Sequence, residues 1–311
     1  MIPLLPLAFA VLDPVNVYAP ATLSSDDVFV QCESAPRTAT PFGPPQSPAD
    51  SGRMYSYFIA PDGNELYFFK RVGNRAEDYR IFRSERNGSE WKTAMQLDLG
   101  GEFSDLYPSL SPDGNRLVFS SYRPIPGDTS QKPNAHLWVA ERRGGTWSEP
   151  TLISASIRGH YHSGVRQDST GAVFLRVTTP DWRVAKDVVL RWNGSRYAQS
   201  FEETPDHPVA KHFRRILGDS LYLWNVTATP GNAYLLSISK VVQPGNRRAP
   251  ATFFVTRALN GRYSPLVPAG AGLAEGSPNF VWFSKDGCFV HYTRDYSQFM
   301  RVPFTSVVPP L

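Results

Sequence analysis

The sequence lacks the features that mark several protein classes. Charged residues make up only 19% of its 311 residues, and the net charge of +4 comes from scattered lysine and arginine without a block of one sign. This pattern disfavours a nucleic-acid-binding protein. The two cysteines, Cys32 and Cys288, are too few and too far apart for a zinc site, and they leave open a disulfide or two buried thiols. No amphipathic helix is indicated.

Catalytic signatures are missing as well. No Gly-x-Ser-x-Gly precedes a helix, which excludes the nucleophile elbow of an α/β-hydrolase. The Gly-Gly pairs at residues 100 and 144 fall in expected hairpins rather than in phosphate-binding loops. The histidines have no neighbouring cysteine or paired carboxylate that completes a metal site, so we expect no metal and no cofactor.

The first residues, MIPLLPLAFAVL, are apolar but have no lysine or arginine ahead of them, and the run is too short to span a membrane. The sequence AFA at Ala8 to Ala10 matches a small-residue cleavage pattern. We interpret residues 1–25 as a signal-like leader, with a strand or tail packed on the domain as the alternative. Residues 26–311 are then one domain.

Proline, glycine and aromatic residues are plentiful, with 28 prolines, 23 glycines and 13% aromatics, which favours short strands joined by turns. The stretch LYPSLSPDGNRLVFSS at 106–121 predicts a hairpin, because Pro, Asp and Gly each suit one turn position. YFIAPDGNELYFF at 57–69 repeats it. Weaker copies follow at 165–177 and 281–293, and the most eroded copy lies at 214–226.

A second hairpin signal follows each of the first four copies: a strand, a glycine-containing turn and then an aromatic residue, at Trp91, Trp147, Tyr197 and Tyr263. One unit spans about 50 to 55 residues, with a longer fourth unit, and its two hairpins supply four strands. The pattern predicts an all-β fold, a β-propeller of five or six four-stranded blades. The recurring Trp91 and Trp147 are expected to pack between blades.

The blade count and the closure of the ring stay open at this point. The strand-like run Ala233–Lys240 indicates either a long hairpin or an additional blade. The last unit, 277–304, has room for about three strands. Asp26–Cys32 supplies the missing strand if the N-terminus crosses to the last blade, and Cys32 and Cys288 then share a blade, which makes a disulfide geometrically feasible.

With these repeats the chain resembles the PD40 family of WD40-like propeller repeats, which also occurs in TolB-like periplasmic proteins. The resemblance is strongest over 55–157, partial over 165–197 and 277–304, and poor over 205–250. It implies a periplasmic or secreted propeller that acts as a non-enzymatic binding or protein-interaction module. It identifies an architecture better than an activity, because such rings host many functions.

The innermost strands of a propeller line a central channel, and ligands usually bind at its mouth. We therefore predict a site among polar and aromatic residues just ahead of the hairpins or at their start, which binds a glycan, another anionic or hydroxyl-rich ligand, or a protein partner. The alternative is a wet channel lined by satisfied polar groups. The candidate residues are Arg53, Asp105, Tyr107, His160, Tyr161, His162, Lys211, His212 and Glu275.

An enzymatic alternative is a carbohydrate-active hydrolase with a carboxylate pair across the channel. Asp105 and Glu275 are the candidates, because the turn itself explains Asp62 and Asp113. No nucleic acid and no membrane span are expected in either case.

Overall fold

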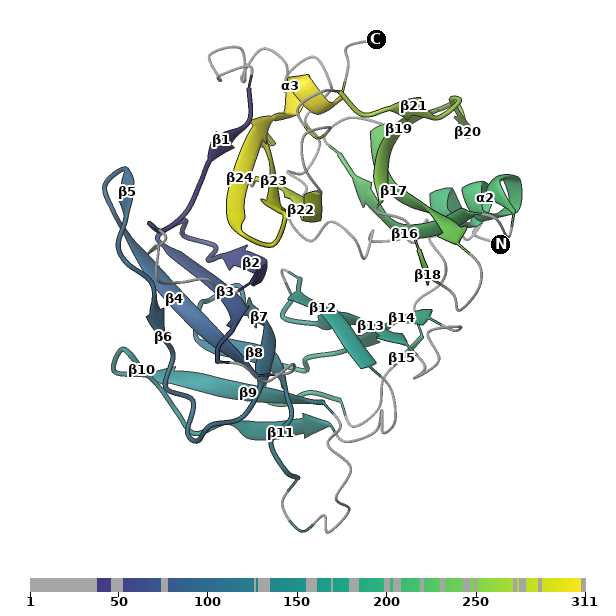
Figure 1. Cartoon of the computed structure of the whole chain (residues 1–311). Coiled ribbons are helices and arrows are strands. Elements are labelled where there is room, and N and C mark those ends of the chain that lie inside the picture. Colours follow the sequence, from purple (N-terminus) through teal and green to yellow (C-terminus); the bar gives the residue numbers. More distant parts are fainter. Residues whose placement is uncertain are drawn as a thin grey trace, which may run out of the picture.

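The strands of this computed structural model form a ring of small antiparallel sheets (Figure 1). The part of the chain that the structure describes contains five such sheets, numbered here as blades 1 to 5 in chain order. The prediction of an all-β propeller is therefore confirmed, with five blades. The described residues are 38–45, 53–73, 78–125, 127, 135–154, 161–168, 170–178, 185–198, 202–203, 208–218, 221–229, 233–242, 247–248, 251–270, 273, 278–284 and 287–308.

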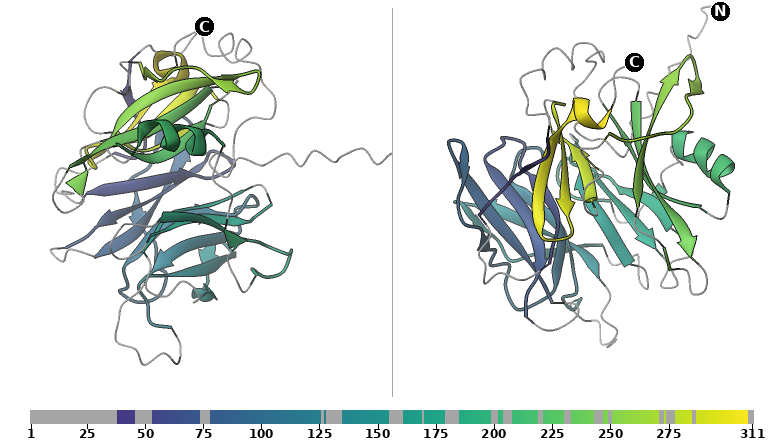
Figure 2. Two further views of the ribbon diagram at one scale, coloured as in Figure 1. Left: turned by 90° about the vertical axis from the view of Figure 1, so that its right-hand side faces the viewer. Right: turned by 45° about the horizontal axis from the view of Figure 1, so that its top comes forward.

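Blades 1 to 3 share one plan, in which successive strands pair from the centre of the ring outwards (Figures 1 and 2). The strands of blade 1 are β2 (Met54–Ile59), β3 (Glu65–Arg71), β4 (Tyr79–Asn87), β5 (Glu90–Trp91) and β6 (Met95–Gln96). Those of blade 2 are β7 (Asp105–Leu110), β8 (Arg116–Ser121), β9 (His136–Arg143), β10 (Thr146–Trp147) and β11 (Thr151–Ser154). Those of blade 3 are β12 (Tyr161–Gln167), β13 (Val173–Thr178), β14 (Ala185–Leu190) and β15 (Glu202–Glu203).

The Pro-Asp-Gly turns join the first two strands of blades 1 and 2, as predicted. In blade 1 the Gly63 N–H donates to the Ala60 carbonyl at 2.8 Å, and the Asp62 side chain accepts from the Asn64 N–H at 3.0 Å. Gly63 has a φ of 78°, which glycine adopts without strain. Asp113 makes the equivalent backbone contact in blade 2 at 3.1 Å. These two aspartates therefore serve the turns.

Blade 4 differs from the sequence-based expectation. The hairpin predicted over 214–226 is not formed, because Pro208–Leu217 is a helix, α2, and Leu221–Ala228 is the innermost strand, β16. The run Ala233–Lys240 belongs to the second strand, β17 (Ala233–Val242), which pairs with β16. Of the two alternatives, the long hairpin within one blade is therefore correct, and the run is not an additional blade. The other strands are β18 (Arg247–Arg248), β19 (Thr252–Leu259), β20 (Arg262–Tyr263) and β21 (Val267–Pro268).

The helix α2 also corrects the expectation that the chain has no amphipathic helix. Its buried side chains, Val209, Ala210 and Phe213, form one stripe, and proline stands at its first position, where a missing N–H costs nothing. The helix has only ten residues. A period of 3.6 is hard to recognise over so short a segment, particularly where it interrupts a strand repeat.

An N-terminal strand completes blade 5, as predicted. The blade consists of β22 (Pro278–Phe283), β23 (Phe289–Arg294) and β24 (Gln298–Pro303), and a short helix, α3 (Phe304–Val307), follows. The strand that pairs with β24 is β1 (Thr40–Pro41), whereas the predicted Asp26–Cys32 lies outside the described residues. Cys288 is disulfide-bonded. The sequence has one other cysteine, Cys32, which also lies outside the described residues.

The innermost strand of every blade departs from regular pairing. The register with the second strand shifts within β2, β7, β12, β16 and β22. A bulge of this kind bends a strand and increases its twist. The repeated bulge is therefore a structural signature of the unit that the sequence pattern does not reveal.

Apolar clusters fill most junctions between the blades. They join blade 1 to blade 2, blade 2 to blade 3, blade 4 to blade 5 and blade 5 to blade 1. The two faces of blade 4 differ, because Leu235 packs toward blade 5 whereas Leu236, on the other face, packs against α2. No apolar cluster of described residues joins blade 3 to blade 4. The helix takes the place of a neighbouring sheet on this face (Figure 1).

The recurring aromatic residues pack between blades, as predicted. The ring of Trp147 in blade 2 meets the ring of Tyr67 in blade 1 edge to face, with 6.3 Å between the ring centres. The Arg142 guanidinium stacks on the same indole at 4.7 Å and donates to the Glu65 carboxylate of blade 1 at 2.7 Å. Trp91 of blade 1 packs in the same way against Phe42, which follows β1 of blade 5.

Candidate functional site

Asp105, the first residue of β7, is a buried partner of an arginine. It is 4% exposed, and the Arg123 Nη2 atom donates to its carboxylate oxygens at 3.2 and 3.3 Å. Arg123 also donates to the Leu99 carbonyl and to Ser121 Oγ, both at 3.0 Å. Burial raises the pKa of Asp105 above its ordinary value, and Ser121 and the Arg123 charge oppose this rise. Asp105 thus links β7 to the segment after β8.

Tyr107 and Arg53 lie near the inner strands in different environments. Tyr107 has a φ of 53° at the bulge of β7, and its ring centre lies 4.8 Å from that of Phe69 in blade 1. Burial raises the pKa of Tyr107. Arg53 immediately precedes β2 and is exposed, with its guanidinium 5.9 Å from the centre of the Tyr296 ring. Of the two, Arg53 is the one that solvent reaches freely.

The other predicted residues do not gather at the same place. His160 and Glu275 lie outside the described residues. Tyr161 and His162 belong to β12, and of these two residues the structure describes only the backbone. Lys211 and His212 lie on α2, which precedes β16, the innermost strand of blade 4, but the helix packs on a face of the blade and His212 reaches Tyr263 of the outer strand β20 (Figure 2). The pair thus stands ahead of the β16–β17 hairpin in the sequence, but on a helix rather than at the start of a strand.

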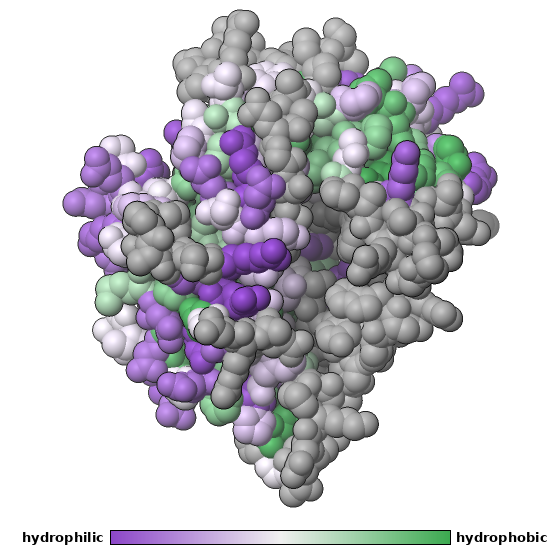
Figure 3. Space-filling model, in the orientation of Figure 1, coloured by the Kyte–Doolittle hydropathy of each residue, from purple (hydrophilic) through white to green (hydrophobic). Residues whose placement is uncertain are grey.

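His212 lines an apolar groove of about 410 Å³ between α2 and the outer hairpin of blade 4, which consists of β19 and β20. Its ring lies 4.9 Å from the rings of both Phe213 and Tyr263. The remaining lining residues are Ile216, Ser264, Pro265 and Leu266. Hydrophobic surface gathers over this part of the molecule, at the upper right of Figure 3, with hydrophilic residues beside it.

Exposed large hydrophobic side chains are concentrated in the same blade and its helix. Among the described residues four such side chains are exposed, and three of them belong here: Ile216 at 59%, Leu259 at 70% and Val267 at 46%. The fourth, Met95, is 75% exposed and lies on blade 1. Such clustering marks interaction surfaces more often than single exposed residues do.

The charge of this region is one-sided as well. Residues 208–270 contain eight lysines and arginines against one aspartate, a formal charge of +7, while the whole chain has +4. Counting charge over the whole chain hides this excess, because residues 1–37 carry a formal charge of −3 and the other units together are neutral. A count for each repeat reveals it from the sequence.

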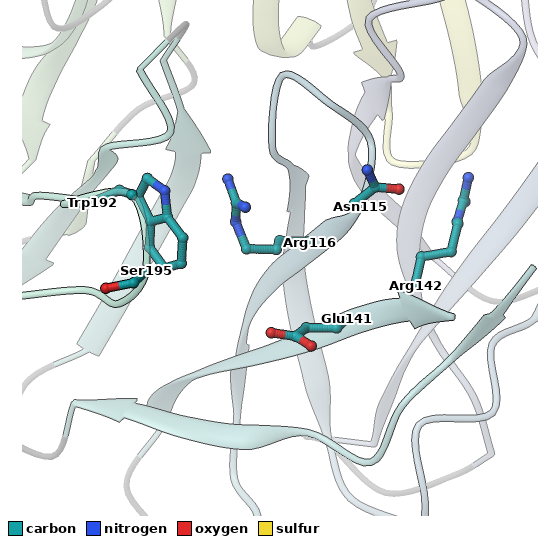
Figure 4. A pocket seen from close by; sticks show the side chains of 7 residues that line it. Asn115, Arg116, Glu141, Arg142, Trp192 and Ser195 are labelled. Atoms are coloured by element: carbon teal, nitrogen blue, oxygen red, sulfur yellow. The ribbon is translucent and has the colours of Figure 1, made fainter. Parts of the chain in front are cut away.

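A second, polar groove of about 290 Å³ lies between blades 2 and 3 (Figure 4). Arg116 lies beside Trp192, with its guanidinium 4.2 Å from the centre of the indole ring, and Arg142 borders the other side. Both arginines join neighbouring blades, since Trp192 belongs to blade 3 and Arg142 binds Glu65 of blade 1. Their charges are therefore engaged in holding the ring together.

Two further properties concern only the described part of the chain. No helix there is long and apolar enough to cross a membrane. No group of three or more histidine, cysteine, aspartate or glutamate residues is placed there to hold a metal ion.

No protein-family model matches this chain, and no curated protein matches it. Similar solved structures include TolB from Agrobacterium tumefaciens, with 13% identity, a TM-score of 0.41 and coverage of 77% of this chain and 69% of that one. An endo-arabinase from Bacteroides thetaiotaomicron VPI-5482 has 10% identity, a TM-score of 0.44 and coverage of 81% and 93%.

A prolyl endopeptidase has 13% identity to this chain and a TM-score of 0.38, with coverage of 84% of this chain. This chain spans only 36% of the length of that peptidase. Likenesses at these scores carry no argument about activity.

Proposed function

We propose that this chain is an exported, TolB-like propeller of the PD40 repeat family that binds a protein partner and catalyses no reaction. The observation that carries the proposal is the concentration of exposed hydrophobic side chains in one of five blades. Ile216, Leu259 and Val267 belong to α2 and blade 4, and burial of apolar area of this kind is the main favourable term in protein association.

The environment of Asp105 also supports a non-enzymatic role. A general acid or a nucleophile must reach the substrate, yet this carboxylate is 4% exposed and occupied by Arg123. Glu275, its partner in the hydrolase alternative, lies outside the described residues.

The disulfide at Cys288 supports export, because disulfides persist in oxidising compartments and are rare in the cytosol. Fractionation of cells that produce the full chain tests this point. We expect it in the periplasm or the medium with no free thiol, and a chain found reduced in the cytoplasm contradicts export.

The test of the function is recovery of a partner together with an assay for turnover. The tagged full-length chain is crosslinked in the organism that produces it and purified, and we expect one protein to co-purify in a fixed ratio. The same preparation is expected to leave a panel of glycans intact. Glycan hydrolysis that is lost in both Asp105→Asn and Glu275→Gln refutes the proposal and establishes the hydrolase.

A further inference from the structure

We propose that the groove between α2 and the outer hairpin of blade 4 binds an acidic amphipathic segment of a partner protein. This inference rests on the proposed function and adds the place of binding and the chemistry of the partner. The floor of the groove is apolar, formed by Phe213, Ile216 and Leu266. Apolar side chains of an incoming segment find their contacts there.

The positive charge beside the groove determines the sign of the charge that the partner segment carries. Lys211 and Arg215 are both exposed and lie one helical turn apart, so they occupy one face of α2, beside the side of the helix that carries His212 and Ile216. On the described residues of blade 4 and α2 there is no aspartate or glutamate. Glutamate or aspartate in the partner is therefore attracted along this rim, where the described residues carry no charge of the same sign to oppose it.

The position of the helix explains why the groove stays open. On the other inter-blade faces, neighbouring sheets bury one another, but here α2 covers blade 4 and leaves a gap beside the hairpin tip. Ile216 remains 59% exposed next to the buried Phe213. A segment that lies in this gap completes a packing layer that the ring itself does not supply.

The shape of the groove favours a protein segment over two other acidic surfaces. A lipid bilayer presents a broad surface that does not enter a concavity between a helix and a hairpin. A nucleic acid gains its affinity from phosphate contacts and from bases stacked on free aromatic faces, whereas the Tyr263 ring is already in contact with His212 and Phe213.

Selection from a random peptide library tests the inference on the intact protein. Phage that display random peptides of about 15 residues, roughly four helical turns, are enriched on the wild-type chain. We expect the enriched peptides to combine aspartate and glutamate with regularly spaced apolar residues. Ile216→Asp is expected to weaken their binding by about tenfold or more, because the added carboxylate repels the peptide and loses solvation in the groove.

Matched variants separate the groove from general surface effects. Met95→Asp changes a hydrophobic residue on blade 1 that is even more exposed than Ile216, and is expected to leave binding unchanged. Arg215→Glu is expected to weaken acidic peptides by about threefold to tenfold, whereas the same change at the exposed Arg196 of blade 3 is expected to have no effect. All four sites are exposed, so thermal melting should confirm that each variant is folded.

Several results overturn the inference. The inference is wrong if no peptide is enriched, if the enriched peptides are basic or neutral, or if Ile216→Asp does not weaken their binding. Three further results would assign the groove to another occupant. The wild type sediments as a dimer that Ile216→Asp dissociates, or the wild type binds phosphatidylglycerol vesicles or duplex DNA and this binding requires Ile216. A crosslinked partner that Ile216→Asp still captures refutes the groove while the proposed function stands.

Discussion

Removal of the Arg123 side chain should destabilise the protein strongly, because it leaves a charge buried without its partner. In Arg123→Met, the Asp105 carboxylate loses its ion pair, and the Leu99 carbonyl loses a hydrogen bond of 3.0 Å. Breaking one side of a buried pair costs about 3–5 kcal/mol. We therefore expect the free energy of unfolding to fall by about 4 kcal/mol at neutral pH, measured by urea denaturation with tryptophan fluorescence.

Two further variants make this prediction specific. Arg143→Met breaks an ion pair with Glu141 on the surface, where Arg143 is 77% exposed, and should cost at most about 1 kcal/mol. The double variant Arg123→Met with Asp105→Leu removes both buried charges and should recover at least about half of the loss. If Arg123→Met costs no more than Arg143→Met, the buried ion pair does not have the role assigned to it.

The pH dependence supplies an independent check. Burial already raises the pKa of Asp105, and loss of the Arg123 charge should raise it further. A carboxyl group whose pKa is higher in the folded state stabilises the fold at low pH, and this contribution is lost as the pH rises through the folded-state pKa. The deficit of Arg123→Met should thus be larger at about pH 8 than at about pH 5, and an equal deficit at both contradicts the assignment.

Three more predictions follow from contacts between and within blades. Glu65→Gln should cost about 1–3 kcal/mol at neutral pH. Burial raises the Glu65 pKa, but hydrogen bonds from Arg142, Arg83 and Tyr67 hold it below its usual value. The carboxylate therefore stabilises the fold above about pH 5, and this stabilisation is lost on acidification. Urea denaturation at several pH values should show a smaller loss of stability on acidification in Glu65→Gln than in the wild type. Trp147→Ala should cost about 2–3 kcal/mol by the same denaturation assay, and no loss would contradict its packing role. A reductant, or Cys288→Ser, should lower the melting temperature in calorimetry by an amount equivalent to about 2–5 kcal/mol, and an unchanged melt in either case refutes a stabilising disulfide.

The polar groove between blades 2 and 3 is a less suitable binding site than the apolar groove of blade 4, because its side chains already hold the ring together. Its two arginines are bound to neighbouring blades through Trp192 and Glu65. A ligand must compete with these contacts to bind there. In the apolar groove of blade 4, a partner contacts the exposed Ile216 without such competition. We therefore place the partner in the apolar groove.

The sequence alone determines the repeat and therefore the class of fold. Pro-Asp-Gly turns and a recurring aromatic residue are local chemistry, because they act within one hairpin and recur wherever the hairpin recurs. For that reason the turns at Asp62 and Asp113 and the packing role of Trp147 are correctly predicted. The pattern fails where it is interrupted, at α2, since a single helix of ten residues carries too few turns to reveal its period.

Only the tertiary structure decides which residues meet. Asp105 has the right place in the sequence for a channel site, but its pairing with Arg123 depends on the path of the chain after β8. Lys211 and His212 lie on a helix that packs on a face of blade 4 because α2, rather than a strand, joins blade 3 to blade 4. Burial, pairing and the shape of a groove depend on contacts between residues far apart in the chain, and no local pattern specifies those contacts.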